Sequence, residues 1–282
     1  MSTSVETETT IRGVEGNIGS RTRRRRSREG GPPRTLLYLG RTLLFVAFIG
    51  LWEMASRQEW IDPILFGSPS GTVKAFIEYV PSDQARTSMT ATFTAVAIAF
   101  VVGSLTGTVA GLALGLSKWL DGIVGPFLAP LNSIPRIALA PLFIAWFGLT
   151  MSAKVVLAVS IVFFILAENA RSAVRSVDHD LMTMGRVVGL KGSAIVWKVV
   201  LPSAVPTIFA GLRLTFTYCL LGVIASEMIA ATNGLGQDIV LFSSSYQINT
   251  VFAILTILMI VAVLVSTVFT VVENRLLVWQ KV

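Results

Sequence analysis

Apolar segments of about twenty residues or more recur along this chain, separated by short polar stretches. About twenty apolar residues make a helix long enough to cross the hydrocarbon core of a bilayer. We therefore expect an all-α integral membrane protein with six transmembrane helices, at about 36–55, 87–117, 123–147, 153–170, 207–231 and 250–272. We expect the chain to consist of a disordered basic cytoplasmic tail (1–33), a first transmembrane helix (34–60), an external amphipathic segment (61–86), a core (87–278) and a C-terminal tail (279–282).

The uncharged segment 87–117 carries glycines at intervals of four residues. Steps of four move only about 40° around a helix, so these glycines form one stripe, along which a second helix can approach closely. The segment is longer than a bilayer core, so its polar start, 87–94, either projects from the membrane or lines a polar cavity. The predicted helix-packing stripe consists of Gly103, Gly107, Gly111 and Gly115.

Prolines interrupt the third predicted helix, 123–147, where they stand at Pro126, Pro130, Pro135 and Pro141. Backbone groups freed by proline at membrane depth are tolerated inside protein or beside water. Arg136 lies among these prolines and Asn132 four residues before it, which makes both candidates for the wall of a substrate path. Glu227, near the end of the fifth helix, is a third candidate. For each, a structural pairing role is the alternative.

Composition narrows the class of function. Of the 282 residues, 53% are hydrophobic and 14% charged, whereas soluble domains have about 25% charged residues. This excludes a free-standing soluble enzyme as the leading class. Cys219 is the only cysteine, so a disulfide framework and a metal site built from cysteines are excluded. His179 is the only histidine, so a metal site with several histidines is excluded as well. No GxxxxGK[ST] phosphate-binding motif occurs, so we expect no catalytic residue, cofactor or metal.

Positive charge is concentrated near the N-terminus, where six arginines fall between Arg21 and Arg28. We interpret this run as a cytoplasmic anchor facing anionic lipid headgroups, without a role for nucleic acid. Six helices then place both termini in the cytoplasm. The cytoplasmic side would also carry Lys118, Arg171, Arg175, Arg186, Lys191, Lys198, Arg275 and Lys281, and the outer side only Arg57, Lys74, Arg86 and Lys154.

The polar loop 173–205 follows the fourth predicted helix. It has the pattern of two short helices broken at 189–193, with apolar residues beyond the need of a solvated loop, namely Leu190, Ile195, Val196 and Trp197. An amphipathic helix–break–helix in the cytoplasm suits the docking of a soluble partner. Packing against the protein's own helices is the alternative.

Several spaced motifs resemble those of ABC importer permeases. Gly189 and Leu201-Pro202 match the loop pattern EAA-x3-G-x9-I-x-LP, although Thr183-Met184-Gly185 replace its EAA and Val199 its isoleucine. The segment 134–148 (IPRIALAPLFIAWFG) resembles the proline-rich core helix of the nitrate/sulfonate/taurine permease group, and Glu227 with Gly234-Leu235-Gly236 its E…GLG segment. Over about 61–278 the chain is similar to type I importer permeases.

This resemblance implies a permease subunit in the bacterial inner membrane, with no chemistry of its own. It implies a second permease copy, a cytoplasmic ATPase dimer and an external solute-binding protein. An arginine in the path suits an anionic solute such as a sulfonate, nitrate or aromatic carboxylate. The resemblance also implies which residues couple the permease to the ATPase, namely Gly185, Gly189, Leu190, Lys191, Trp197, Leu201 and Pro202.

Two other hypotheses belong to different classes. An ion-coupled secondary carrier would require an internal inverted repeat, and we find none that is convincing. A non-transporting scaffold that binds lipid through its arginine tail would leave the prolines and the loop unexplained.

Overall fold

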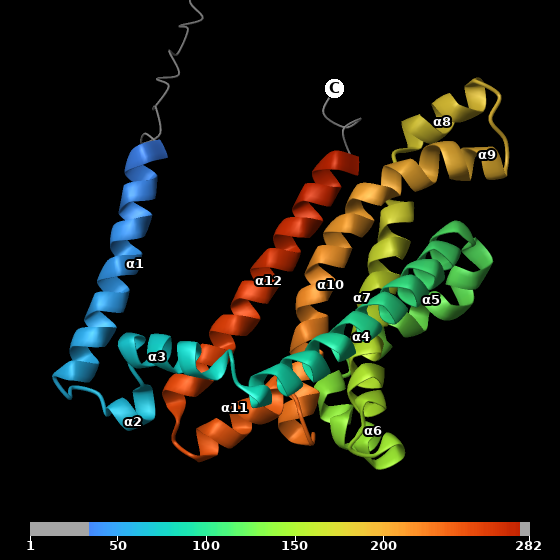
Figure 1. The fold of residues 1–282 in the computed structure, drawn as a ribbon. Coiled ribbons are helices and arrows are strands. Elements are labelled where there is room, and N and C mark those ends of the chain that lie inside the picture. Colours follow the sequence, from blue (N-terminus) through green and yellow to red (C-terminus); the bar gives the residue numbers. More distant parts are fainter. Residues whose placement is uncertain (1–33, 277–282) are drawn as a thin grey trace, which may run out of the picture. The chain divides into compact units, whose positions relative to one another are not determined.

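The computed structural model describes residues 34–276, which form helices and no strand (Figure 1). The predicted tails lie outside the described residues. The helices are α1 (Arg34–Arg57), α2 (Pro63–Phe66), α3 (Pro69–Tyr79), α4 (Asp83–Leu116), α5 (Lys118–Ser133), the 3-10 helix η1 (Arg136–Leu139), α6 (Ala140–Phe147), α7 (Met151–Arg175), α8 (His179–Val187), α9 (Ser193–Ile195), the π-helix η2 (Val196–Val200), α10 (Leu201–Ile229), α11 (Leu235–Ser244) and α12 (Ile248–Leu276).

Five helical runs in the described part of the chain are long and apolar enough to cross a membrane: α1, α4, α7, the run from α9 to α10, and α12. A sixth crossing is made if α5 and the η1–α6 pair, bent by 83° at a short break, form one broken span. The break falls at Ile134-Pro135, within the proline-rich segment. The all-α membrane fold is therefore confirmed, with five spans, or six when the bent pair is counted as one broken span.

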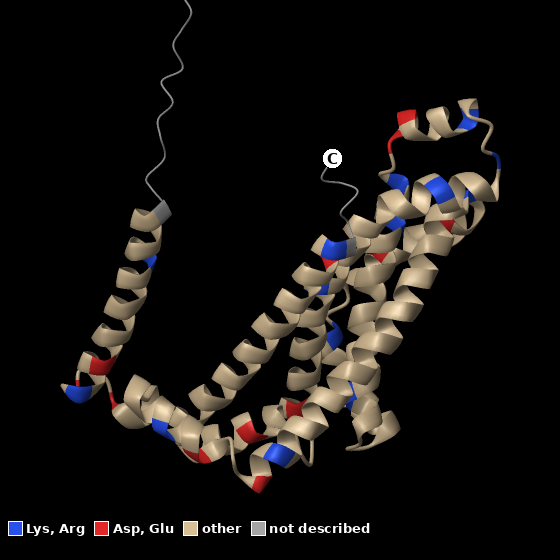
Figure 2. Ribbon diagram, turned by 45° about the horizontal axis from the view of Figure 1, so that its top comes forward, with Lys and Arg blue, Asp and Glu red and all other residues tan. Residues whose placement is uncertain are grey.

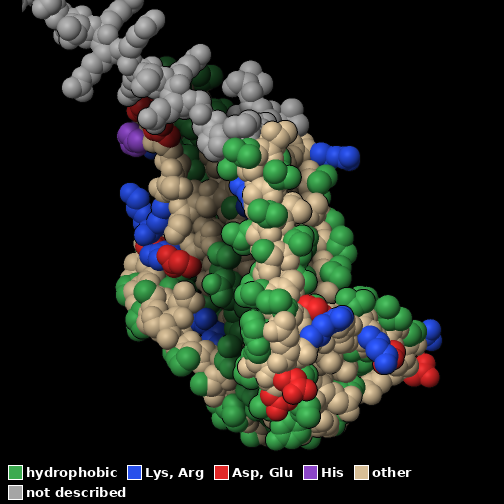
Figure 3. Space-filling view, turned by 90° about the vertical axis from the view of Figure 1, so that its left-hand side faces the viewer, with side chains coloured by type: hydrophobic (Ala, Val, Ile, Leu, Met, Phe, Trp, Pro, Cys, Tyr) green, Lys and Arg blue, Asp and Glu red, His purple; other side chains and the backbone are tan. Residues whose placement is uncertain are grey.

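Large apolar side chains are exposed over much of these helices, as expected where lipid, not water, is the surroundings. Leu105, Phe127 and Val263 are 66%, 63% and 59% exposed. The space-filling view in Figure 3 shows such side chains spread over the surface.

Short polar caps set the boundaries of several helices. The Ser68 hydroxyl accepts a hydrogen bond from the Gly71 amide at the start of α3, and Pro69 follows it as the first helical residue. Ser117 ends α4, and its hydroxyl accepts from the Leu120 amide at the start of α5. α11 ends at Ser244, and three residues separate it from α12.

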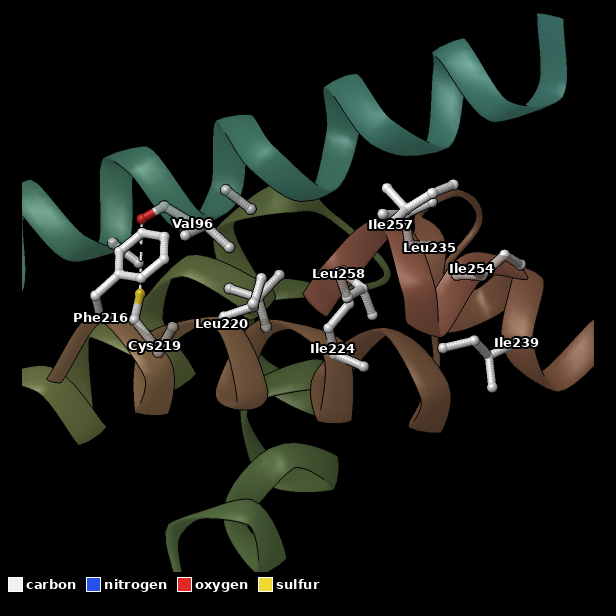
Figure 4. Packing of buried hydrophobic residues seen from close by; sticks show 14 of the residues in the cluster. Val96, Phe216, Cys219, Leu220, Ile224, Leu235, Ile239, Ile254, Ile257 and Leu258 are labelled. Carbon is white, nitrogen blue, oxygen red and sulfur yellow. Dashed lines mark hydrogen bonds between the residues drawn. The ribbon is translucent and has the colours of Figure 1, made fainter. Parts of the chain in front are cut away.

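The chain divides into two compact units, with the boundary inside α1 at Ile49–Gly50. In the second unit, α7 lies between α4 and α10, and α11 contacts α10 and α12. Buried side chains from these helices form one apolar core (Figure 4), in which Phe216, Leu220 and Ile224 of α10 meet Val96 of α4 and Leu235 of α11. One end of this unit carries α3 and α11, and the opposite end carries α8 and α9 (Figure 1).

The glycine stripe of α4 lies against α7. A Cβ atom added at Gly103 would lie 2.7 Å from Val162 Cβ, and one at Gly107 would lie 2.6 Å from the Phe163 carbonyl oxygen. Gly111 faces the Ala167 carbonyl and Gly115 the Val174 side chain in the same way. Since real Cβ atoms do not approach other atoms this closely, only glycine permits the observed distance between the two helices.

Candidate functional site

The α7–α10 loop, residues 176–200, is built from short helical pieces. α8 begins after Asp178, whose carboxylate accepts a hydrogen bond from the Asp180 amide at 2.8 Å. The chain then turns at Gly189 and Gly192, whose φ angles are +89° and +51°. Residues with side chains rarely adopt such angles. The glycines thus set the break between α8 and α9, where the sequence predicts it.

Pro202 shapes the helix that follows the break. It has no N–H to donate to the Lys198 carbonyl four residues earlier. The turn before it is a π-helix, in which the Leu201 amide donates to the Val196 carbonyl five residues back. The helix therefore continues without interruption from Ser193 to Ile229, and it joins the α7–α10 loop directly to the core.

The predicted loop residues lie on two faces of this structure. Gly185 is buried, and a Cβ added there would lie 3.4 Å from Val199 Cγ2. A groove between α8 and the start of α10 is lined by Leu181, Met184, Gly185, Val188, Leu190, Lys198, Val199, Pro202 and Ser203. Outside the groove, Val187 and Trp197 are 82% and 71% exposed, and Val188, which also lines the groove, is 80% exposed. Exposed apolar side chains of this kind are typical of interaction surfaces.

Arg136 lies directly after the break that ends α5. Its guanidinium donates to Asn132 Oδ1 at 3.1 Å and to the Leu131 carbonyl at 2.8 Å. The Arg136 Cζ atom also lies 4.3 Å from the centre of the Phe164 ring of α7, in a cation–π contact. The structure thus brings two predicted path residues together, and it leaves the Asn132 side chain exposed and that of Arg136 half-buried.

Glu227 is fully buried, unlike the other two predicted path residues. Its Oε1 lies 3.0 Å from Lys154 Nζ of α7, and its Oε2 accepts from the Gly236 amide at 3.0 Å. Thr92 of α4 donates to the same carboxylate at 2.9 Å, while the Lys154 ammonium donates to the Asn233 carbonyl at 2.6 Å. This polar network joins α4, α7, α10 and the turn before α11.

The contacts of Glu227 are those of the structural pairing role, the alternative to a place in a substrate path. Its side chain has no exposed surface, and every carboxylate oxygen has partners within the protein. Thr92 likewise faces this carboxylate, so the polar start of the second predicted helix packs inside the protein at this point. A Cβ at Gly234, whose φ is +137°, would collide with the Glu227 carboxylate, which explains a glycine at that position.

A second buried carboxylate, that of Asp238, anchors the surface helix α3. It accepts from the Tyr79 hydroxyl at 2.5 Å and from Gln84 Nε2 at 2.9 Å. Burial, followed by the hydrogen bond to Asp238, raises the pKa of Tyr79 far above its usual range, so the hydroxyl stays protonated. At its other end α3 is held by Glu53, which accepts from the Ser70 amide at 3.0 Å and from the Ser70 hydroxyl at 2.8 Å.

Ion pairs hold the helices together at the α8 end. Asp121 of α5 pairs with Arg171 and Arg175 of α7, and Arg171 also pairs with Glu168 at 3.2 Å. Arg213 of α10 lies 3.2 Å from the Thr270 hydroxyl and is paired with a glutamate, Glu273, on α12. These ion pairs link neighbouring helices, so each charge has its partner within the protein.

A family model describes most of this part of the chain. Residues 103–278 match the family of binding-protein-dependent transport system inner membrane components. The match includes the broken span, the α7–α10 loop and, apart from Thr92, the buried network at Glu227. This chain belongs to that family. It is a permease, a transport subunit of an ABC importer in the inner membrane, and not an enzyme.

Curated relatives agree with this assignment. The permease is 34% identical over 201 residues to an aliphatic sulfonates transport permease protein, SsuC, of Escherichia coli, in a match that covers 71% of this chain and 76% of that one. It is 27% identical over 240 residues to the formylaminopyrimidine transport permease protein ThiX of Halalkalibacterium halodurans, with coverages of 85% and 95%. The two relatives are named for different solutes, so the likeness shows the class of transport without its substrate.

Solved structures support the fold of the permease. A chain of the MetNI methionine ABC transporter, in an inward-facing conformation, superposes with a TM-score of 0.59 at 19% identity, and the match covers 72% of the permease and 97% of that chain. Among the described residues of the permease, no group of three or more His, Cys, Asp or Glu side chains could hold a metal ion.

The buried ion pair of Lys154 is a feature that the sequence did not predict. The sequence places Lys154, the fourth residue of α7, among the positive residues of the outer side. In the structure its side chain is only 4% exposed. The available signal was weak: a lysine that begins an apolar span, and an acidic residue near the end of a later one. Asp121 and Asp238 were missed for the same reason, since their partners lie on other helices.

Proposed function

We propose that the permease is driven by a cytoplasmic ATPase that docks on the α7–α10 loop. The observation that carries this proposal is the exposed apolar surface of the loop, in which Val187, Val188 and Trp197 are more than two-thirds exposed. The loop residues expected in coupling are Gly185, Gly189, Leu190, Lys191, Trp197, Leu201 and Pro202. The uninterrupted helix from Ser193 to Ile229 would carry a displacement of the loop into the core.

The distribution of charge supports a cytoplasmic position for the α8 end and for both termini. Arg171, Arg175 and Arg186 lie at or near this end of the second unit, and six arginines precede α1 in the sequence. Positive residues favour the cytoplasmic side of a membrane. The opposite end, with α3 and α11, then faces outward, where an external solute-binding protein would deliver the substrate.

A small anionic solute fits the groups at the broken span best. Arg136 supplies a cation and Asn132 a polar side chain at a helix break, the position at which backbone and side-chain groups can face a path through a membrane protein. A sulfonate, nitrate or aromatic carboxylate has the matching charge, and the name of the Escherichia coli relative is consistent with a sulfonate.

The assembly that follows from the family has two permease copies, two ATPases and one external binding protein. The two copies would alternate between inward-open and outward-open states around a central path. ATP must favour one of these states through tighter binding to it. A homodimer is proposed for the two copies.

Co-purification from the native host tests this function. The tagged chain is isolated in mild detergent, and bound subunits are identified and weighed. We expect a stoichiometric ATPase with a Walker motif, which is lost in Gly189→Arg. Gly122→Arg is the matched control, because a side chain at Gly122 meets open space and the position is outside the loop. Transport that persists after ATP depletion, without any bound ATPase, would instead support the ion-coupled carrier.

A further inference from the structure

The tip of the α7–α10 loop, residues 186–193, carries positive charge that no ion pair within residues 34–276 neutralises. Arg186 and Lys191 lie at the tip and Lys198 lies on the following helix, and all three side chains are exposed. None of the three forms an ion pair with any residue between 34 and 276. By contrast, Arg171 and Arg175 at the nearby end of α7 are paired with Asp121, and Arg213 within α10 is paired with Glu273.

Acidic groups of the loop lie only at its base. Asp178 and Asp180 stand at the start of α8, while Arg186 stands in its last turn. Figure 2 shows this separation, with red at the start of α8 and blue toward its far end. The tip between them and α9 therefore presents cations without an intervening carboxylate.

The same tip is strongly apolar. Val187 and Val188 are 82% and 80% exposed, and they lie directly beside Arg186. An apolar surface beside unpaired cations fits a concave partner surface with an apolar floor and acidic residues at its rim.

The proposed function supplies a protein as this partner. Permeases of this family associate with an ATPase, so the exposed loop tip is assigned to that subunit and not to lipid headgroups.

We infer that the groove of the partner ATPase that receives this loop is acidic, and that Arg186 and Lys191 select the ATPase by charge. This inference rests on the proposed function and deepens it, since it names the chemistry of the docking partner. The apolar contacts of Val187 and Val188 would supply affinity, while the two cations would exclude ATPases whose groove is basic.

Charge variants of the full chain test the inference. Arg186→Glu/Lys191→Glu, Arg186→Gln/Lys191→Gln and the control Lys118→Glu, an exposed cation of α5 outside the loop, are purified from the native host. The amount of Walker-motif ATPase per permease is measured at 50, 150 and 500 mM salt. We expect at least a tenfold loss at 150 mM for the reversed pair, a smaller loss for the neutral pair and none for Lys118→Glu. Wild-type retention should fall with salt, and that of the neutral pair should change much less.

A crosslink identifies the groove itself. Cys219 is buried and is the only cysteine, so Ser193→Cys adds a single accessible thiol at the tip. A bifunctional crosslinker on this thiol should join an ATPase segment that contains two or more Asp or Glu residues near the attachment point. A segment dominated by Lys and Arg would overturn the inference.

The outcomes separate this inference from the proposed function. If the wild type binds an ATPase and the reversed pair binds it equally at every salt concentration, the charge inference is wrong and the proposed function stands. If the wild type binds no ATPase, the proposed function fails. If all variants bind the ATPase equally but the reversed pair loses transport only in vesicles that contain phosphatidylglycerol, the tip contacts anionic lipid and the inference is also wrong.

Discussion

Lys154 Nζ lies 3.0 Å from Glu227 Oε1, and the two side chains are 4% and 0% exposed. The pair joins α7 to α10 at the end where α11 packs. Removal of one member leaves a buried charge without its counterion, which typically costs about 3–5 kcal/mol, whereas replacement of both costs much less than the sum. This difference makes the pair accessible to a double-mutant cycle.

We expect Lys154→Met and Glu227→Gln each to lower the melting temperature of the purified permease by roughly 5–15 °C. The double variant should recover part of the loss, because neither charge is then left alone. Melting followed by intrinsic tryptophan fluorescence in detergent is the measurement. Strictly additive losses would show that the two charges do not interact.

Gly111→Ala should destabilise the permease although alanine is the better helix former. The added methyl would collide with the Ala167 carbonyl of α7, so α4 would have to move. Gly122→Ala is the matched control in another helix, where nothing lies within 4 Å, and it should be neutral or stabilising by up to about 1 kcal/mol. Equal melting temperatures for both variants would contradict close α4–α7 packing.

Substitutions at Gly189 should separate backbone strain from contact with the ATPase. Its φ of +89° disfavours alanine by about 1–2 kcal/mol, whereas asparagine tolerates positive φ better. No atom lies within 4 Å of an added Cβ, so steric collision within the chain is absent. ATP-dependent transport in reconstituted vesicles should therefore fall more in Gly189→Ala than in Gly189→Asn. The opposite order would indicate that the partner, and not φ, restricts this position.

Arg136 should control the charge of the transported solute. Arg136→Gln would remove the cation at the helix break, so transport of the native anion should fall at least tenfold, with a smaller effect on an uncharged analogue. Phe164→Leu removes only the ring under the guanidinium, a contact of about 0.5–2 kcal/mol, and should give an intermediate loss. If Arg136→Gln transports every tested anion at the wild-type rate, Arg136 is excluded from the path.

The Tyr79–Asp238 contact predicts a particular dependence on pH. The folded-state pKa of Tyr79 is raised above the unfolded value of about 10, so its contribution is fully present below pH 10 and declines above it, where the unfolded tyrosine ionises first. The difference in stability between wild type and Tyr79→Phe should be constant from pH 7 to about 9.5 and then shrink. A difference that shrinks already between pH 7 and 9 would point to another titrating group.

Features that depend on local spacing were predictable from the sequence. The glycines of α4 recur every four residues, Asn132 and Arg136 are four residues apart, and Gly189 marks a turn by its own conformational freedom. Long apolar runs likewise predict membrane spans without knowledge of their neighbours.

Features that depend on the meeting of distant segments were not predictable. Lys154 and Glu227 are 73 positions apart, and Tyr79 and Asp238 are 159 apart. A single sequence gives each charge but not its counterion, so a buried structural pair and a group in a substrate path look alike. The 83° bend between α5 and the η1–α6 pair was also beyond the sequence, because proline predicts an interruption but not its angle.

The contact between α4 and α7 has a mechanical consequence. Backbone meets backbone at Gly107 and Gly111, so no compressible layer of side chains separates the two helices, and they must tilt together. α7 has 25 residues and a length of about 37 Å, with α8 three residues beyond one end and Lys154 in the first turn of the other. A tilt of about 5° imposed at the α8 end would displace the far end by roughly 3 Å. α7 is thereby a lever arm, and its far end is fixed to Glu227.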